Sequence, residues 1–120
     1  MTTLPLLPAL CGPSLLKTDP ATLLRLLVLA PLLEEWIVRA GLQEWLMRRW
    51  AGNTPLAVLA PAAGFSLLHA GAGWFAAAAV FTPGLAMGLL YRHSRDWRLC
   101  AAAHALCNGF AHIFCSMNFQ

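Results

Sequence analysis

The sequence predicts an all-α protein, a multi-pass transmembrane helix bundle of about four helices, and two observations support this prediction. Of its 120 residues, 59% are hydrophobic and only 11% are charged, whereas about a quarter of a soluble domain is charged. A soluble bundle of this size would have too few polar side chains to cover its surface. The apolar residues also fall into long stretches of the length that crosses a bilayer. We expect one membrane-embedded domain over residues 1–120, of which residues 1–20 form a proline-rich lead.

The first helix is predicted over residues 21–50. Thr18 or Asp19 can cap its N-terminus, with Pro20 near its first turn. A continuous helix of this length measures about 45 Å, which exceeds the ~30 Å hydrocarbon core of a bilayer. Its last part, residues 43–50, is amphipathic and is expected to lie in the membrane interface.

The uncharged stretch that follows is too long for one crossing and predicts two helices, over residues 55–70 and 73–91. The segment Ala70-Gly71-Ala72-Gly73 is the expected break between them. Gly84 and Gly88 form a GxxxG pattern, which favours close packing of two helices.

A basic connector over residues 92–98 precedes the fourth apolar stretch, residues 99–120. The loop after the first helix is also basic, whereas the break at residues 70–73 has no charge. Positive charge on alternate loops predicts a multi-pass protein of the cell membrane, with the first and third loops in the cytoplasm. The net charge of +3 is explained by this orientation, so we expect the lipid bilayer and no nucleic acid as a partner.

Four cysteines occur at positions 11, 100, 107 and 115. The last three lie on one predicted helix face, and the four are interpreted as small apolar packing residues. A metal site or a disulfide is the alternative.

Two adjacent carboxylates, Glu34 and Glu35, interrupt the first apolar helix together with Arg39. Each unpaired charge near a bilayer centre costs roughly 2.5 to 3.5 kcal/mol. Glu35 and Arg39 are four residues apart and can pair along the helix, so Glu34 is left for other work. A desolvated carboxylate opposed by a histidine is suited to act as a general base for water. The alternative is a salt-bridged cluster that only holds helices together.

The other predicted helices supply polar partners at His69, His104, Asn108 and His112. A single histidine inside a membrane helix is often a packing residue, but several on facing helices indicate a cavity, because ionisable groups in lipid usually line one. These side chains can converge with Glu34 if the first helix runs nearly straight.

Three motifs occur in order, each on a separate apolar helix: Glu34-Glu35-x-x-x-Arg39, Phe65-x-x-x-His69 and His104-x-x-x-Asn108. Each alone is weak, but the ordered set resembles the motifs of the CPBP intramembrane protease family, also called the Abi or CAAX protease family. The resemblance covers residues 34–108.

This resemblance implies a glutamate-type endopeptidase that works inside the membrane. It implies that Glu34 activates water together with His69, that His104 and Asn108 stabilise the oxyanion, and that the second glutamate and the arginine of the first motif, Glu35 and Arg39, support the site. No cofactor is expected. Zinc held by His69, His104 and His112 is the alternative, although the spacing lacks a zincin signature.

The function expected from these observations is hydrolysis of a peptide bond near a membrane-anchored or lipid-modified tail, such as a CAAX-type C-terminus or a sorting signal. Two other hypotheses remain open. The chain could be a non-enzymatic membrane protein, such as an immunity factor or chaperone on the same scaffold. It could also form an ion or proton pathway, since buried glutamate and histidine also act as relays.

Overall fold

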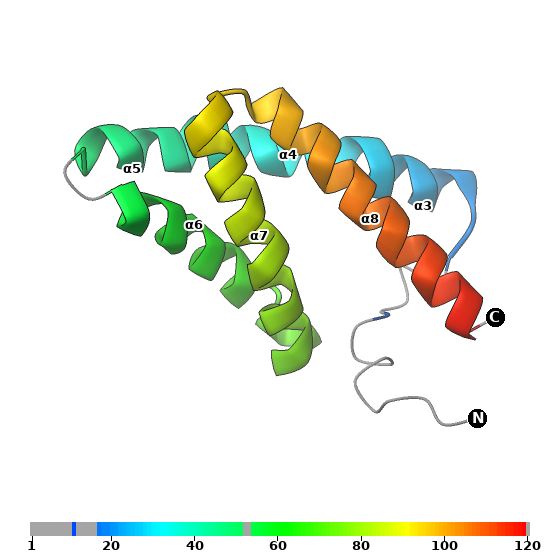
Figure 1. The fold of residues 1–120 in the computed structure, drawn as a ribbon. Helices are drawn as coiled ribbons and strands as arrows, with labels where there is room; N and C mark the ends of the chain where they lie inside the picture. The colour runs from blue at the N-terminus through cyan, green and yellow to red at the C-terminus, as the bar shows by residue number, and fades with distance from the viewer. Residues whose placement is uncertain (1–10, 12–16, 52–53, 120) are drawn as a thin grey trace.

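The computed structural model describes residue 11 and residues 17–51 and 54–119, which form four helical stretches and no strand (Figure 1). The predicted all-α bundle is therefore confirmed. The single domain over residues 1–120 stays a prediction, and most of the lead lies outside the described residues.

The first stretch is one unbroken helix from Pro20 to Arg49 (Figure 1). Regular α-helical turns alternate along it with wider π-helical turns, in the order α3 (Pro20–Leu24), η1 (Arg25–Leu29), α4 (Ala30–Glu35), η2 (Trp36–Gln43) and α5 (Glu44–Arg49). Asp19 is the N-cap, because its Oδ2 accepts the backbone N–H of Thr22 at 3.1 Å. A second hydrogen bond, from the Thr22 hydroxyl, helps to hold the pKa of the Asp19 carboxyl below its usual value of 3.8.

The second and third stretches form a helical hairpin (Figure 1). Its elements are α6 (Thr54–Leu68), the short turn η3 (Ala70–Ala72) and α7 (Trp74–Ser94). Gly73 has a φ of 109°, which a residue with a side chain rarely adopts, and it allows the chain to reverse before α7. The predicted break at residues 70–73 is confirmed.

The predicted connector over residues 92–98 is wrong in length, because only Arg95 and Asp96 separate α7 from α8 (Trp97–Phe119). Arg95 ends α7 in the left-handed conformation, with a φ of 56°. The Asp96 carboxylate then accepts the backbone N–H of Arg98 at 3.0 Å and starts the next helix. Local capping therefore turns a basic segment into a tight corner.

Four helices converge where α5, the start of α6, the end of α7 and the start of α8 meet. The buried cluster there consists of Leu46, Met47, Ala57, Tyr91 and Cys100. Beside it, Glu44 forms a clasp between helices, defined by its bonds to the Tyr91 hydroxyl at 2.9 Å and to Arg95 Nη1 at 2.9 Å. The Glu44 clasp joins the first helix to the α7–α8 corner.

Large apolar side chains also cover much of the outer surface, as Leu68 at 82% and Phe110 at 73% exposure illustrate. Within the described residues, two helices are long and apolar enough to cross a membrane, Trp74–Ser94 and Trp97–Asn118, while the apolar helix α6 is shorter. An apolar surface of this kind fits a lipid environment.

The interpretation of all four cysteines as packing residues is wrong. Cys11 and Cys115 form a disulfide that spans 104 residues of sequence. Cys100 is buried and does pack in the core, but Cys107 is exposed. A seven-residue spacing rotates only about 20° around a helix with 3.6 residues per turn, so the different burial of Cys100 and Cys107 reflects the packing of Cys100 in the core cluster at the start of α8.

Candidate active site

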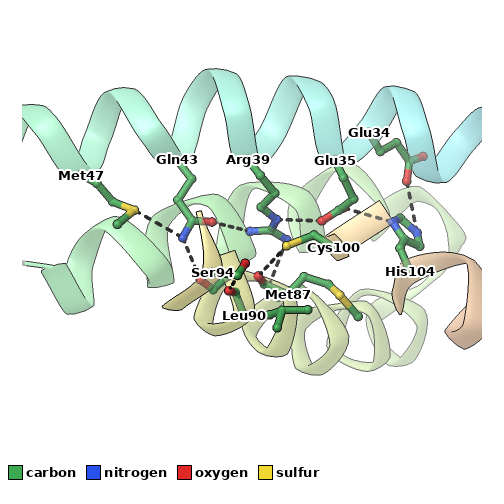
Figure 2. A network of polar contacts seen from close by, with 12 residues as sticks. Glu34, Glu35, Arg39, Gln43, Met47, Met87, Leu90, Ser94, Cys100 and His104 are labelled. Atoms are coloured by element: carbon green, nitrogen blue, oxygen red, sulfur yellow. Dashed lines mark hydrogen bonds and ion pairs between the residues drawn. The ribbon is translucent and has the colours of Figure 1, made fainter. Parts of the chain in front are cut away.

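A row of polar side chains four residues apart, Glu35, Arg39 and Gln43, faces α7 from the first helix (Figure 2). Their exposed fractions are 2%, 1% and 0%. The last two lie in η2, whose wide turns hold slightly more than four residues, so side chains at this spacing stay nearly aligned. Gln43, the first residue of the predicted interfacial segment 43–50, is fully buried inside the protein, and the interfacial placement of that segment stays a prediction.

The Arg39 guanidinium has an acceptor on each of its three nitrogens. Nε donates to Glu35 Oε1 at 2.8 Å, Nη1 to Gln43 Oε1 at 2.8 Å, and Nη2 to the carbonyl oxygen of Gly84 at 3.1 Å. The predicted pair between Glu35 and Arg39 is thus confirmed. A buried charge with this many partners avoids most of the cost of desolvation.

His104 of α8 lies between the two carboxylates of the first helix (Figure 2). Its Nδ1 is 3.0 Å from Glu35 Oε2, and its Nε2 is 3.5 Å from Glu34 Oε2. An ionised carboxylate only accepts hydrogen bonds, so Nδ1 carries a proton that it donates to Glu35. His104 therefore links both glutamates.

The two glutamates differ in the number of their partners and in the exposure of their carboxylates. Both oxygens of Glu35 have partners, Arg39 and His104, and the side chain is 2% exposed. The Glu34 side chain is 37% exposed and its ion-pair contact is with His104. Glu34 is consequently the carboxylate that another molecule can approach.

His69 directly follows α6, and the ring of Phe65, one turn earlier, lies next to the rings of both His69 and His104. The Phe65 ring centroid is 4.7 Å from that of His69 and 6.2 Å from that of His104, where the rings meet edge to face. His69 Nδ1 is 2.9 Å from the carbonyl oxygen of Phe65. A carbonyl can only accept, so Nδ1 is the donor and Nε2 of the neutral ring is the basic nitrogen. The charge of Glu34 interacts with both His104 and His69.

Asn108, one turn beyond His104, donates its amide Nδ2 to the carbonyl oxygen of Leu26 at 2.8 Å. In η1 the N–H of Ala30 bonds to Arg25, five residues back. The next bond of that pattern would join residue 31 to Leu26, but Pro31 has no N–H. Asn108 therefore satisfies a carbonyl that a proline leaves open, and it uses one of its two amide hydrogens to do so.

The structure thus places Glu34, Glu35, His69 and His104 in one neighbourhood, with Asn108 on the next turn of α8. His112, expected to extend this stripe, follows one turn further along the same helix. Among the described residues, no group of three or more His, Cys, Asp or Glu side chains is arranged to hold a metal ion.

Residues that sequence reasoning missed are Gln43, the carbonyl groups of Gly84 and Gly88, and that of Leu26. Gln43 carried a usable signal, because it is four residues after Arg39 and extends the spacing of the Glu35–Arg39 pair. The carbonyl groups carried none, since every residue has one.

A model of the family described as type II CAAX prenyl endopeptidase Rce1-like matches residues 17–110. No curated protein and no solved structure matches the chain. At the level of the family, its members are membrane-embedded endopeptidases that act on prenylated, membrane-anchored proteins. The match confirms the resemblance to CAAX proteases. Because it covers most of the sequence and includes all three motifs, the chain belongs to the type II CAAX prenyl endopeptidase Rce1-like family.

Proposed function

We propose that this chain is an intramembrane endopeptidase in which Glu34 activates the water that hydrolyses a peptide bond near a membrane-anchored tail. The observation that supports this assignment most is the different surroundings of the two adjacent glutamates. Glu35 is enclosed by Arg39 and His104, whereas Glu34 is half-exposed and faces the same histidine. A general base must be reachable by the water whose proton it takes.

Charge balance gives His104 a defined role in this proposal. Two carboxylates and the Arg39 guanidinium sum to one negative charge, so one proton held between Glu34 and His104 makes the cluster neutral. When that proton sits on His104 Nε2, Glu34 is a carboxylate that can accept a proton from water. Neutrality matters because an uncompensated charge in a low-dielectric site is costly.

The proposed hydrolysis consists of attack by water on the peptide carbonyl and cleavage of the carbon–nitrogen bond. Glu34 takes one proton from water, and the hydroxide oxygen bonds to the carbonyl carbon of the scissile peptide. The tetrahedral intermediate then breaks its carbon–nitrogen bond, and Glu34 returns the proton to the leaving nitrogen. The products are a carboxylic acid and an amine.

Asn108 and His69 are proposed to serve the same step from the other helices. The second amide hydrogen of Asn108 is suited to donate to the developing oxyanion, and loss of one such donor costs roughly 100- to 1000-fold in rate. His69 Nε2 is suited to orient the water. His104, expected from the resemblance to be an oxyanion donor, instead directs both ring nitrogens at carboxylates, so we propose that it holds the proton of Glu34.

The substrate proposed from the family is a prenylated protein with a C-terminal CAAX sequence. The test uses the full chain in detergent, a farnesylated CAAX peptide, and mass measurement of the products. Glu34→Gln should lower cleavage about 100- to 10,000-fold while the protein keeps its thermal midpoint. Full activity in Glu34→Gln would refute the role of Glu34.

The proton-pathway hypothesis fits the described structure less well. The row of titratable side chains from Glu34 through His104 to Glu35 meets Arg39 and Gln43, neither of which exchanges protons under ordinary conditions. Proton flux in proteoliposomes, lost in Glu34→Gln and without any peptide product, would favour a pathway. A phenotype that survives loss of His69 would favour the non-enzymatic hypothesis.

A further inference from the structure

We infer that Gln43 is a positioning residue for the hydrolytic centre, which it orients through Arg39, Glu35 and His104. The effect of Gln43 on catalysis rests on the proposed function, whereas its effect on the orientation of these side chains does not. Glu34, Glu35, Arg39, Gln43 and His104 are called the polar row below.

Gln43 connects the polar row to a second helix. Its Oε1 accepts from Arg39 Nη1 at 2.8 Å, and its Nε2 donates to the carbonyl oxygen of Gly88 on α7 at 2.8 Å. The Nε2 group also lies 3.8 Å from the Met47 sulfur. The side chain is 0% exposed, so water cannot replace either partner, and both ends of the amide are fixed.

This arrangement requires an amide. One end of the side chain must accept from a guanidinium while the other donates to a carbonyl. A glutamate at this position could accept from Arg39 but could not donate to Gly88 unless protonated. It would also offer Arg39 a second carboxylate, in competition with Glu35.

The contact with α7 is close because position 88 has no side chain. A Cβ atom there would lie 3.0 Å from Val58 Cγ1, 3.4 Å from Arg39 Nη1 and 3.5 Å from Gln43 Oε1. The GxxxG pattern therefore does more than allow two helices to pack. Its two glycines present carbonyl oxygens to Arg39 and Gln43.

A series of hydrogen bonds and ion-pair contacts connects Gln43 to the reacting carboxylate of Glu34. With Nη1 held by Gln43 and Nη2 by Gly84, the planar guanidinium has one orientation, in which Nε points at Glu35 Oε1. The other oxygen of Glu35 then meets His104 Nδ1, which sets the ring so that Nε2 faces Glu34. Without Gln43, Nη1 is a buried donor with no acceptor, and only the bonds of Nε to Glu35 and of Nη2 to Gly84 hold the guanidinium in place.

The experiment compares wild type with Gln43→Met, which keeps the length and removes both hydrogen bonds, and with Gln43→Glu, which keeps only the acceptor. Glu44→Gln is the matched control, since it removes a polar contact at the next position of the same helix without touching the polar row. The full chains are purified in detergent. Cleavage of a farnesylated CAAX peptide gives kcat and KM, and ¹⁵N NMR of the histidine ring nitrogens reports the hydrogen bonds of His104.

Gln43→Met is expected to lower kcat about 10- to 100-fold, as loss of the hydrogen-bond partners that orient metal ligands does in metalloenzymes. KM should stay near its wild-type value, because Gln43 touches no substrate. The His104 ring resonances should move in both Gln43 variants and stay in place in Glu44→Gln. Gln43→Glu should not restore kcat.

Unchanged His104 resonances in Gln43→Met would overturn the inference, whatever the activity. Moved resonances in a protein whose wild type cleaves no peptide would leave the positioning role standing and refute the proposed function. A fall of kcat in Glu44→Gln equal to that in Gln43→Met would also count against Gln43, since general loosening of the helix would explain both.

Discussion

His104 Nδ1 and Glu35 Oε2 lie 3.0 Å apart, although the two residues are 69 positions apart in the sequence. The contact joins the first helix to α8 at the point where Glu35 also meets Arg39. Glu35 is therefore the residue through which the two helices share a buried charge.

Replacement of Glu35 should destabilise the protein more than replacement of its neighbour. Glu35→Ala leaves Arg39 buried without its counter-charge, and removal of one partner of a buried pair costs about 3–5 kcal/mol. Glu34→Ala should have a smaller effect on the free energy of unfolding, because that side chain is 37% exposed. Thermal and denaturant unfolding in detergent compare them, and equal losses would contradict the structure.

The two glycines of α7 should respond differently to the same substitution. Gly88→Ala forces a Cβ to within 3.0 Å of Val58 Cγ1, whereas in Gly84→Ala the nearest atom is the Ala62 Cα at 3.7 Å, an ordinary contact. Overpacking costs typically about 1–3 kcal/mol, so Gly88→Ala should lose stability and activity while Gly84→Ala keeps both. Val58→Ala should partly restore Gly88→Ala. If both glycine variants lose activity equally, close approach at Gly88 is not the cause.

Asn108 and Pro31 should be coupled through the carbonyl of Leu26. Asn108→Ala leaves that part-buried acceptor unsatisfied, at a cost of up to about 1–3 kcal/mol. Pro31→Ala supplies an N–H that can take its place, so Asn108→Ala should cost less stability in that background. A double-mutant cycle on the free energy of unfolding measures the coupling.

Cleavage separates the two roles of Asn108. If its second amide hydrogen stabilises the oxyanion, the loss of kcat in Asn108→Ala should persist in the Pro31→Ala background. A full return of kcat there would assign Asn108 a structural role only.

The Glu44 clasp should make stability depend on acid pH. Burial raises the pKa of the Glu44 carboxyl, but hydrogen bonds from Tyr91 and Arg48 and the charge of Arg95 outweigh it, so the pKa lies below the usual 4.5. A depressed pKa in the folded state contributes stability that is present above the unfolded value and is lost as pH falls through the folded one. Wild type should exceed Glu44→Gln in thermal midpoint at neutral pH, and the difference should shrink below about pH 4.5. A difference that grows in acid would contradict the clasp.

The cysteines should differ in their reactivity toward a maleimide. Cys107 is exposed and free, Cys100 is free but buried, and Cys11 and Cys115 are joined. The folded, non-reduced protein should therefore take one label, and Cys107→Ser should abolish it. Labelling of Cys115 without prior reduction would contradict the disulfide.

Part of the fold was available from local features of the sequence. Long apolar stretches predict four helices, Asp19 and Pro20 predict where the first begins, and Gly73 marks a reversal. These features act between residues that are close in the chain. The connector before α8 was predicted too long because its positive charge was taken as the sign of a loop. The Asp96 carboxylate instead caps the start of α8 within this segment.

The site was predictable in its residue types and less so in its contacts. The spacing of Glu35 and Arg39 determined their pairing, because residues four apart share a helix face. His104 could be expected near the glutamates, but nothing in the sequence said that it would lie between them. That position depends on how α8 crosses the first helix.

By itself, then, the sequence determined that the protein is helical and apolar, that Glu35 would be paired with Arg39, and which side chains could form a hydrolytic site. Only the tertiary structure decided that Gln43 is buried against Gly88, that Asn108 meets the carbonyl left open by Pro31, and that Cys11 joins Cys115. The physical reason is that each of these contacts links positions far apart in the chain. The partners in these contacts are backbone carbonyls or distant side chains. Which of them meet is decided only when the helices pack against each other in one register.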